Sequence, residues 1–165
     1  MIDIEGWVAK YNTKGHFGAR FAPGCFHECA NNKVPVTKKP SLLFISEPDS
    51  IIGYAELEER PEGLYCICHL NKLVKDTTIE QMAKNGEIKS FSFFAQRVKC
   101  ENQKNRRTKR KVYTSAYIRA ISPDISQIEC STIERITYKK DDDTYVQFIP
   151  KKEEQRFNNG PADED

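Results

Sequence analysis

The chain has 165 residues, of which 26 are Lys or Arg and 24 are Asp or Glu, and its formal net charge is +2. This length suits one domain with a buried core, and the near balance of charge excludes a whole-molecule attraction to nucleic acid. The sequence holds no run of about 18 apolar residues, so we expect no membrane contact. The acidic N-terminus lacks the basic and then apolar pattern of a secretion signal, which predicts that the chain stays in the cytosol where it is made.

The first half of the chain predicts four strands, two of them paired in a hairpin. A Pro-Gly turn introduces a short helix over residues 25–31, and the Pro- and Lys-rich residues 33–40 are typical of a connector. Residues 59–63 have the composition of a turn, so the strands on either side should form a hairpin. The runs of aliphatic and aromatic residues that predict strands are 4–11, 42–45, 51–58 and 64–71.

The second half predicts one helix, further strands and a charged end. Asp76 is suited to cap the start of a helix and Gly86 to end it, and apolar residues recur between them at helical spacing. Residues 101–110 are highly polar and predict a loop. The strands expected around and after this loop cover residues 90–98, 112–121 and 125–138, the last run as one strand or two.

This pattern of many short strands separated by turns favours a mainly β fold with a few short helices, a small closed β-barrel or sheet. We expect residues 1–138 to form this domain. Residues 139–165 are charged and poor in aliphatic side chains. Such a segment buries little apolar area by itself, so we expect this extension to become ordered only against partners.

The six cysteines are expected to be free thiols, because a reducing compartment does not favour disulfides. Two groups could in principle gather zinc, but neither has the two-residue spacing of a zinc ribbon. We therefore expect no metal site and no cofactor. The two groups are Cys25, His27 and Cys29, and Cys66, Cys68 and His69.

Several short segments, in this order along the chain, carry a resemblance to one known family. They are Glu5-Gly6-Trp7, Phe21-Ala22-Pro23-Gly24, residues 42–53, Glu62-Gly63-Leu64-Tyr65, residues 86–94 and Ile128-Glu129-Cys130-Ser131. Together they resemble the phage prohead maturation proteases, which are distant relatives of the herpesvirus assembly protease. The resemblance implies the fold of that family and a place in the virion or procapsid, with synthesis in the cytoplasm of a bacterial host.

The resemblance also implies a catalytic triad of which one member is missing. Ser92 matches the nucleophile and Glu129 matches the acidic residue that orients the base, but Ser46 stands where the family has its histidine. A serine hydroxyl needs a neighbouring base, and another hydroxyl cannot accept its proton at neutral pH. Loss of a triad member lowers turnover by about 10⁴ to 10⁶. Phe94, where the family has a glycine, would further crowd a substrate.

Other readings of these residues remain open. His69 is the best alternative base among the three histidines, although a strand histidine is more often structural. Without the resemblance, Ser92 and Glu129 would be ordinary strand positions. With it, we expect Ser46, Ser92 and Glu129 to cluster in the fold.

A basic run between the predicted strands places six cations within eight residues. It is either a solvated loop or a contact arm for an acidic capsid protein or for packaged DNA. No aromatic residue lies within it, which argues against stacking on bases. The candidate partner-binding residues are Lys104, Arg106, Arg107, Lys109, Arg110 and Lys111.

Three functions follow from these features. The first is a catalytically inactive capsid-assembly or auxiliary protein that binds the major capsid protein or other virion proteins in multiple copies. The second is an active serine endopeptidase that processes the procapsid with an unusual base. The third is a nucleic-acid-binding β domain that uses the basic run.

Overall fold

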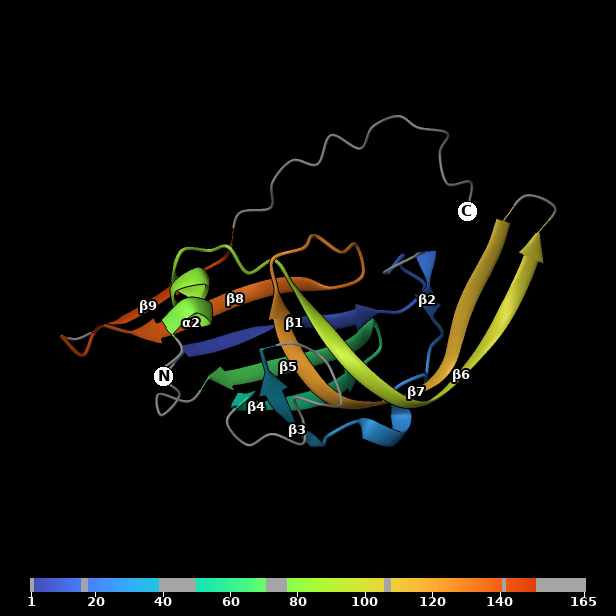
Figure 1. Cartoon of the computed structure of the whole chain (residues 1–165), viewed down its shortest axis with the longest axis horizontal. Coiled ribbons are helices and arrows are strands. Elements are labelled where there is room, and N and C mark those ends of the chain that lie inside the picture. Colours follow the sequence, from blue (N-terminus) through green and yellow to red (C-terminus); the bar gives the residue numbers. More distant parts are fainter. Residues whose placement is uncertain are drawn as a thin grey trace, which may run out of the picture.

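A strongly curled β-sheet, a half-barrel, dominates the fold (Figure 1). The computed structural model of the chain describes residues 2–15, 18–38, 50–70, 77–105, 108–140 and 142–150. Within these residues the strands are β1 (Ile2–Lys10), β2 (Arg20–Phe21), β3 (Lys33–Thr37), β4 (Ile51–Arg60), β5 (Gly63–Leu70), β6 (Ser90–Asn105), β7 (Thr108–Asp124), β8 (Thr132–Lys139) and β9 (Tyr145–Phe148). The prediction of a mainly β fold is confirmed.

The strand order brings distant parts of the chain together. Along the sheet the order is β2-β7-β3-β4-β5-β1-β8-β9, and β6 pairs with β7 outside this path. The predicted hairpin is the antiparallel β4–β5 pair. The predicted helix is α2 (Thr77–Lys84), which is followed by Gly86 at a positive φ of 73°. Within the described residues, no helix is long and apolar enough to cross a bilayer.

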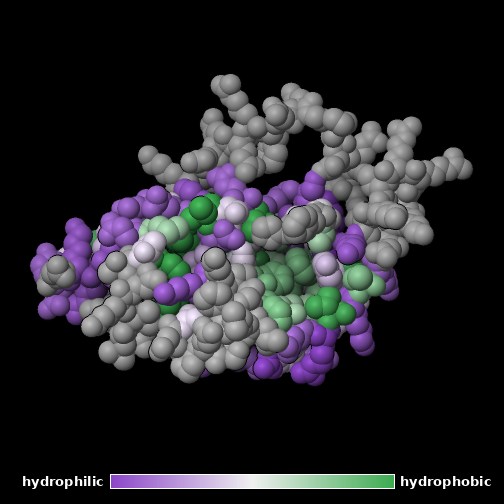
Figure 2. All heavy atoms as spheres, in the orientation of Figure 1, coloured by the Kyte–Doolittle hydropathy of each residue, from purple (hydrophilic) through white to green (hydrophobic). Residues whose placement is uncertain are grey.

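The two faces of the sheet differ in polarity, because successive strand residues point to opposite sides. On β1, Ile2 and Ile4 are buried in the core, whereas Asp3 and Glu5 alternate with them on the outer face. Cys66 and Cys68 of β5 join the same core. On the face of the molecule seen in Figure 2, apolar residues gather near the middle and hydrophilic residues surround them.

Two segments that the sequence predicts to be irregular form strands instead. Residues 33–37, expected in a connector, form β3, in which Val34 and Val36 are buried between β4 and β7. The polar loop expected over residues 101–110 is largely the end of β6 and the start of β7, with Asn105 paired to Thr108. The loop prediction was wrong because the two strands of this ribbon satisfy each other's backbone groups, which requires no apolar alternation. The connector prediction was wrong because Lys33 and Pro35 obscured the two buried valines.

Other predicted elements are shorter than expected or displaced. The helix predicted over residues 25–31 is a single 3₁₀ turn, η2 (His27–Cys29). Residues 128–131, predicted as strand, form a turn before β8. The strand predicted over residues 42–45 lies outside the described residues.

The predicted C-terminal extension begins inside β8. Residues beyond it form β9, which pairs with β8, and Phe148 packs edge-on against Tyr138 at a ring separation of 6.4 Å. The strand β9 is therefore continuous with the sheet. Residues 151–165 lie outside the described part of the chain.

Candidate active site

Ser92 lies on β6, directly opposite Ser122 of β7. Its hydroxyl donates a short hydrogen bond to Oδ2 of Asp124. The other carboxylate oxygen, Oδ1, accepts a bond of 3.0 Å from the backbone N–H of Ser126. The acidic partner of Ser92 is thus Asp124, which sequence reasoning missed because the predicted strand ended three residues earlier.

The segment that carries Ser46 begins beside this pair of strands. Ser122, opposite Ser92, donates a hydrogen bond of 2.8 Å to the carbonyl of Lys38. Thr37 pairs with Ile51, so the intervening residues form the connection between β3 and β4. Ser46 itself lies outside the described residues, and its approach to Ser92 stays a prediction.

Glu129 occupies the turn before β8 and is exposed. Its neighbours Ile128 and Cys130 are buried and line the same pocket as Ser92. The turn therefore lies close to Ser92, but the hydroxyl of Ser92 is directed to Asp124 rather than to Glu129. A role for Glu129 as orienting acid remains a prediction.

Ser131 fixes the start of β6 against the sheet. Its buried Oγ accepts a hydrogen bond of 2.9 Å from the backbone N–H of Phe91, next to Ser92. Carbonyl oxygens of Trp7, at 2.9 Å, and Phe91, at 3.2 Å, are within reach of its proton. Ser131 belongs to the segment Ile128-Glu129-Cys130-Ser131, but no local pattern predicts that its hydroxyl joins β1 to β6.

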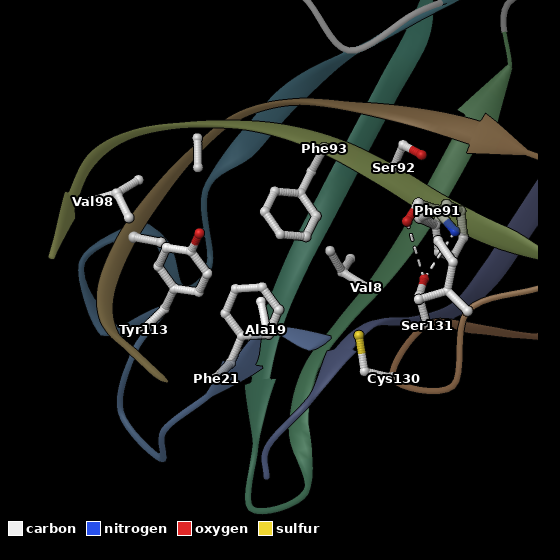
Figure 3. A pocket seen from close by; sticks show the side chains of 13 residues that line it. Val8, Ala19, Phe21, Phe91, Ser92, Phe93, Val98, Tyr113, Cys130 and Ser131 are labelled. Atoms are coloured by element: carbon white, nitrogen blue, oxygen red, sulfur yellow. Dashed lines mark hydrogen bonds between the residues drawn. The ribbon is translucent and has the colours of Figure 1, made fainter. Parts of the chain in front are cut away.

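An apolar pocket of about 640 Å³ opens beside Ser92 (Figure 3). Phe93 points into it, whereas the hydroxyl of Ser92 points away from the ring of Phe93. Cys130 also lines the pocket, and burial raises the pKa of its thiol to about 11. The thiol is therefore protonated at neutral pH and is no substitute nucleophile.

The side chain of His69 is held on the outer face of the sheet. Its Nδ1 lies 2.8 Å from Oδ1 of Asp3 on β1, and its Nε2 lies 3.1 Å from Oε2 of Glu56 on β4. Burial lowers the pKa of His69, but the hydrogen bonds and charges of these two carboxylates outweigh it and raise the pKa. With both ring nitrogens engaged, this histidine has no free nitrogen for the hydroxyl of Ser92.

The other histidines give no base at this pocket within the described residues. The side chain of His27 is 87% exposed, with its Nδ1 3.9 Å from a carboxylate oxygen of Glu59. His16 lies outside the described residues.

The comparison with known protein families matches residues 1–147 to the caudovirus prohead serine proteases. The chain belongs to this family. None of the curated proteins or solved structures compared with the chain matches it. Membership of this family indicates a function related to capsid maturation, in the context of a procapsid or virion.

Two glycines of the quoted segments are explained by close packing of backbones in this prohead-protease-family chain. A Cβ on Gly6 would lie 2.2 Å from the carbonyl oxygen of Thr132, and one on Gly53 would lie 2.0 Å from that of His69. A side chain at Gly6 would push β1 away from β8, and a side chain at Gly53 would push β4 away from β5. The glycines therefore set the strand spacing.

The cysteines of this family member do not assemble a metal site in the described part of the chain. No group of three or more His, Cys, Asp or Glu side chains there could hold a metal ion. Cys66 and Cys68 point into the core with their sulfur atoms 3.9 Å apart, on the opposite face from His69. Burial raises the pKa of Cys66 well above its usual value and that of Cys25 to about 12. All six are free thiols, and only Cys100 is exposed.

The basic run lies at the end of the β6–β7 ribbon, which projects from the sheet in Figure 1. Lys104 pairs with Lys109 through the backbone near the end of the ribbon, and Lys111 further down is exposed. Arg106 and Arg107 lie outside the described residues. The strands thus carry the basic run to one end of this prohead-protease-family fold.

Proposed function

We propose that this chain is a procapsid or virion component that keeps the prohead-protease fold but lacks peptidase activity. The observation that carries the proposal is the hydrogen bond from Ser92 to the carboxylate of Asp124. The residue matched to the nucleophile is thereby paired with an acid rather than with an imidazole.

A carboxylate is poorly suited to activate this serine. An aspartate has a pKa of about 3.9 in the absence of perturbation, whereas an efficient general base has a pKa near the operating pH. The other carboxylate oxygen, Oδ1, already accepts a hydrogen bond from the backbone N–H of Ser126. Phe94, two residues after Ser92 and therefore on the same strand face, is half-buried, and it stands where the family has a glycine.

The hydrogen bond from Ser92 to Asp124 is also compatible with a second candidate function, an active endopeptidase in which Asp124 is the unusual base. The two candidates differ in the reactivity of one hydroxyl. A fluorophosphonate probe forms a covalent bond with an activated serine and spares an inactive one. Labelling therefore separates them without knowledge of the substrate.

The experiment incubates the full chain with the probe at neutral pH and locates any adduct by mass spectrometry. We expect no labelling of Ser92 and no cleavage of capsid precursor. Labelling that disappears in a Ser92→Ala variant, together with cleavage of the precursor, would establish the endopeptidase instead. An inhibitable serine protease of known activity serves as the positive control.

We further propose that the protein binds the major capsid protein or other virion proteins in multiple copies. The basic run at the end of the β6–β7 ribbon supports this proposal, because a concentration of cations in the sequence attracts acidic partners. A variant in which Arg106, Arg107, Lys109 and Arg110 are all changed to Ser should recover less capsid protein in a pull-down, most clearly at low salt. Equal recovery by both proteins at low and high salt would exclude the ribbon from the contact.

DNA is a second candidate partner for the same ribbon. A two-stranded β-ribbon fits the major groove of B-DNA, and each phosphate contact steepens the salt dependence of binding. We expect the fourfold Ser variant to bind duplex DNA more weakly and with a shallower salt dependence. A salt-independent interaction, or none with the unaltered protein, would exclude DNA.

A further inference from the structure

The sheet ends at β9, a short strand with one open edge in the described part of the chain. There β9 is the last member of the strand order and pairs with β8 alone. It lies on the opposite side of the molecule from the β6–β7 ribbon (Figure 1). Unpaired backbone groups make such an edge a template for another strand, and native proteins often protect it with charged side chains. The run from Tyr145 to Ile149, however, contains no charged residue.

Alternate residues of β9 turn their backbone groups to the open edge. The N–H of Lys140 donates a hydrogen bond of 2.8 Å to the carbonyl of Thr144, which closes the β8–β9 hairpin. Bonded and non-bonded pairs alternate along antiparallel strands. Val146 therefore bonds to β8 through its backbone, whereas Tyr145 and Gln147 direct their N–H and C=O groups outward.

Two large apolar side chains stand exposed on one face of this edge. Tyr145 is 73% exposed and Ile149 is 74% exposed. Gln147 lies midway between them and is also exposed, while the residues between these three are half-buried, as expected for side chains that alternate between two faces. Pro150 comes next, on the alternation that faces β8, so its missing N–H removes no donor from the open edge.

The charges on the two sides of this run have opposite sign. Asp141, Asp142 and Asp143 precede it in the sequence, and Lys151 and Lys152 follow it. A parallel neighbour with the same sequence would bring like charges together. An antiparallel neighbour would instead bring the acidic side of one strand next to the basic side of the other, which favours pairing of two identical strands.

We propose that β9 pairs in antiparallel fashion with β9 of a second copy of the chain, with the two-fold axis at Gln147. In this register Gln147 exchanges both backbone hydrogen bonds with its symmetry mate, and Tyr145 lies opposite Ile149 of the second copy. The two apolar side chains then cover each other on both sides of the axis, and aspartates before each strand meet lysines after the other. A register shifted by two residues would set Tyr145 against Gln147 or Lys151 instead.

The pairing joins two sheets into one through an interface that uses the same surface on both copies. A single strand edge is much smaller than the interface of an obligate dimer, so we expect reversible association with a Kd of about 0.1 mM. Such an affinity becomes effective where several copies are held close together. The proposal goes beyond the proposed function and does not rest on it.

A cysteine at the two-fold axis tests the register. Gln147→Cys is made together with Cys100→Ser, which removes the exposed thiol of the chain. In the pair, the two new thiols lie on Cα atoms about 5.5 Å apart, within the range of a disulfide, so mild oxidation should give a covalent dimer. Thr137→Cys in the same background is the matched control, because Thr137 pairs with Gln147 one strand further in and lies about 14 Å from its mate. Equal cross-linking of the two variants, or none in either, would overturn the proposal.

Sedimentation equilibrium of the full chain up to about 1 mM measures the affinity. Gln147→Pro removes an N–H from the open edge while the bonds to β8 remain, and it should abolish the dimer. Ile149→Ser should weaken the dimer about tenfold, because both Tyr–Ile pairs are lost. Ile125→Ser, at an isoleucine that is 59% exposed and lies between β7 and β8, is the matched control and should leave the dimer unchanged. A chain that stays monomeric, or a dimer that survives Gln147→Pro, would overturn the proposal.

Salt dependence tests the antiparallel orientation. A variant with Lys151 and Lys152 both changed to Asp should dimerise about fivefold more weakly than the unaltered chain at low salt. The difference should shrink at high salt, because exposed charges are screened. Equal affinity of the two proteins at low salt would contradict the orientation.

These outcomes are separate from those of the proposed function, since fluorophosphonate labelling and the pull-down through the β6–β7 ribbon do not use β9. The same pull-down also tests a different occupant of the edge. If Gln147→Pro lowers the recovery of capsid protein while the unaltered chain is monomeric, the edge binds that protein and self-pairing is wrong.

Discussion

Substitution of Ser131 by Ala should destabilise the fold through a single lost hydroxyl. The Oγ of Ser131 is buried and accepts the N–H of Phe91 at 2.9 Å, while its own proton reaches the carbonyl of Trp7 at 2.9 Å. Alanine keeps the backbone of the turn but leaves the Phe91 N–H and the Trp7 carbonyl without these bonds.

The size of the effect follows from the unpaired donor. A buried polar group that loses its partner costs about 1–3 kcal/mol, and we expect a loss of about 2 kcal/mol in the free energy of unfolding. For a chain of this length, such a loss corresponds to a fall of about 4–8 °C in Tm. With a typical urea dependence of about 2 kcal/mol per molar, the midpoint should fall by about 1 M.

The assay is urea unfolding followed by the fluorescence of Trp7, the single tryptophan of the chain. Ser126→Ala is the control, because Ser126 is exposed and takes part in the described bonds through its backbone. The control should stay within about 0.5 kcal/mol of the unaltered protein. A Ser131→Ala protein that is equally stable, or a control that loses as much, would refute the role given to this hydroxyl.

Two further changes test the sheet. The carboxylates of Glu56 and Asp3 outweigh burial and raise the pKa of His69, so its protonation stabilises the fold fully below pH about 6.5, and that contribution is lost as pH rises through the raised pKa. The urea midpoint of the unaltered protein should therefore fall over this range more than that of His69→Gln, and parallel curves would contradict the interpretation. Gly53→Ala places a Cβ 2.0 Å from the carbonyl oxygen of His69 and should cost more than about 2 kcal/mol or prevent soluble expression. A neutral effect in urea unfolding would mean that β4 and β5 can separate at no cost.

Local patterns in the sequence predict the elements whose signals are short-range. The hairpin β4–β5 follows from a turn composition between two apolar runs, and the end of α2 follows from Gly86. The order of short segments is enough to indicate the family, and where these segments fall within the described residues they lie in strands and turns of the sheet. None of these inferences requires knowledge of which strands become neighbours.

The predictions that were wrong or missing depend on long-range pairing. Asp124 meets Ser92 only because β6 and β7 pair in one register, and a shift by one residue would turn one of the two side chains to the other face. The strand β3 looked like a connector because Lys33 and Pro35 obscured two buried valines. Glu129 is in a turn because the chain must reverse before β8, which its apolar neighbours did not reveal.

The end of the β6–β7 ribbon is a suitable place to insert a tag for locating the protein in an assembled particle. The strand β6 ends at Asn105, 13 residues after Ser92, which corresponds to about 40 Å of extended strand. Only two residues join Asn105 to Thr108, so a small tag inserted there would lengthen the ribbon while the register at its base is kept. Such a tag would mark each copy of the protein for electron microscopy of procapsids at a point remote from the core, and the number of marks per particle would give its stoichiometry directly.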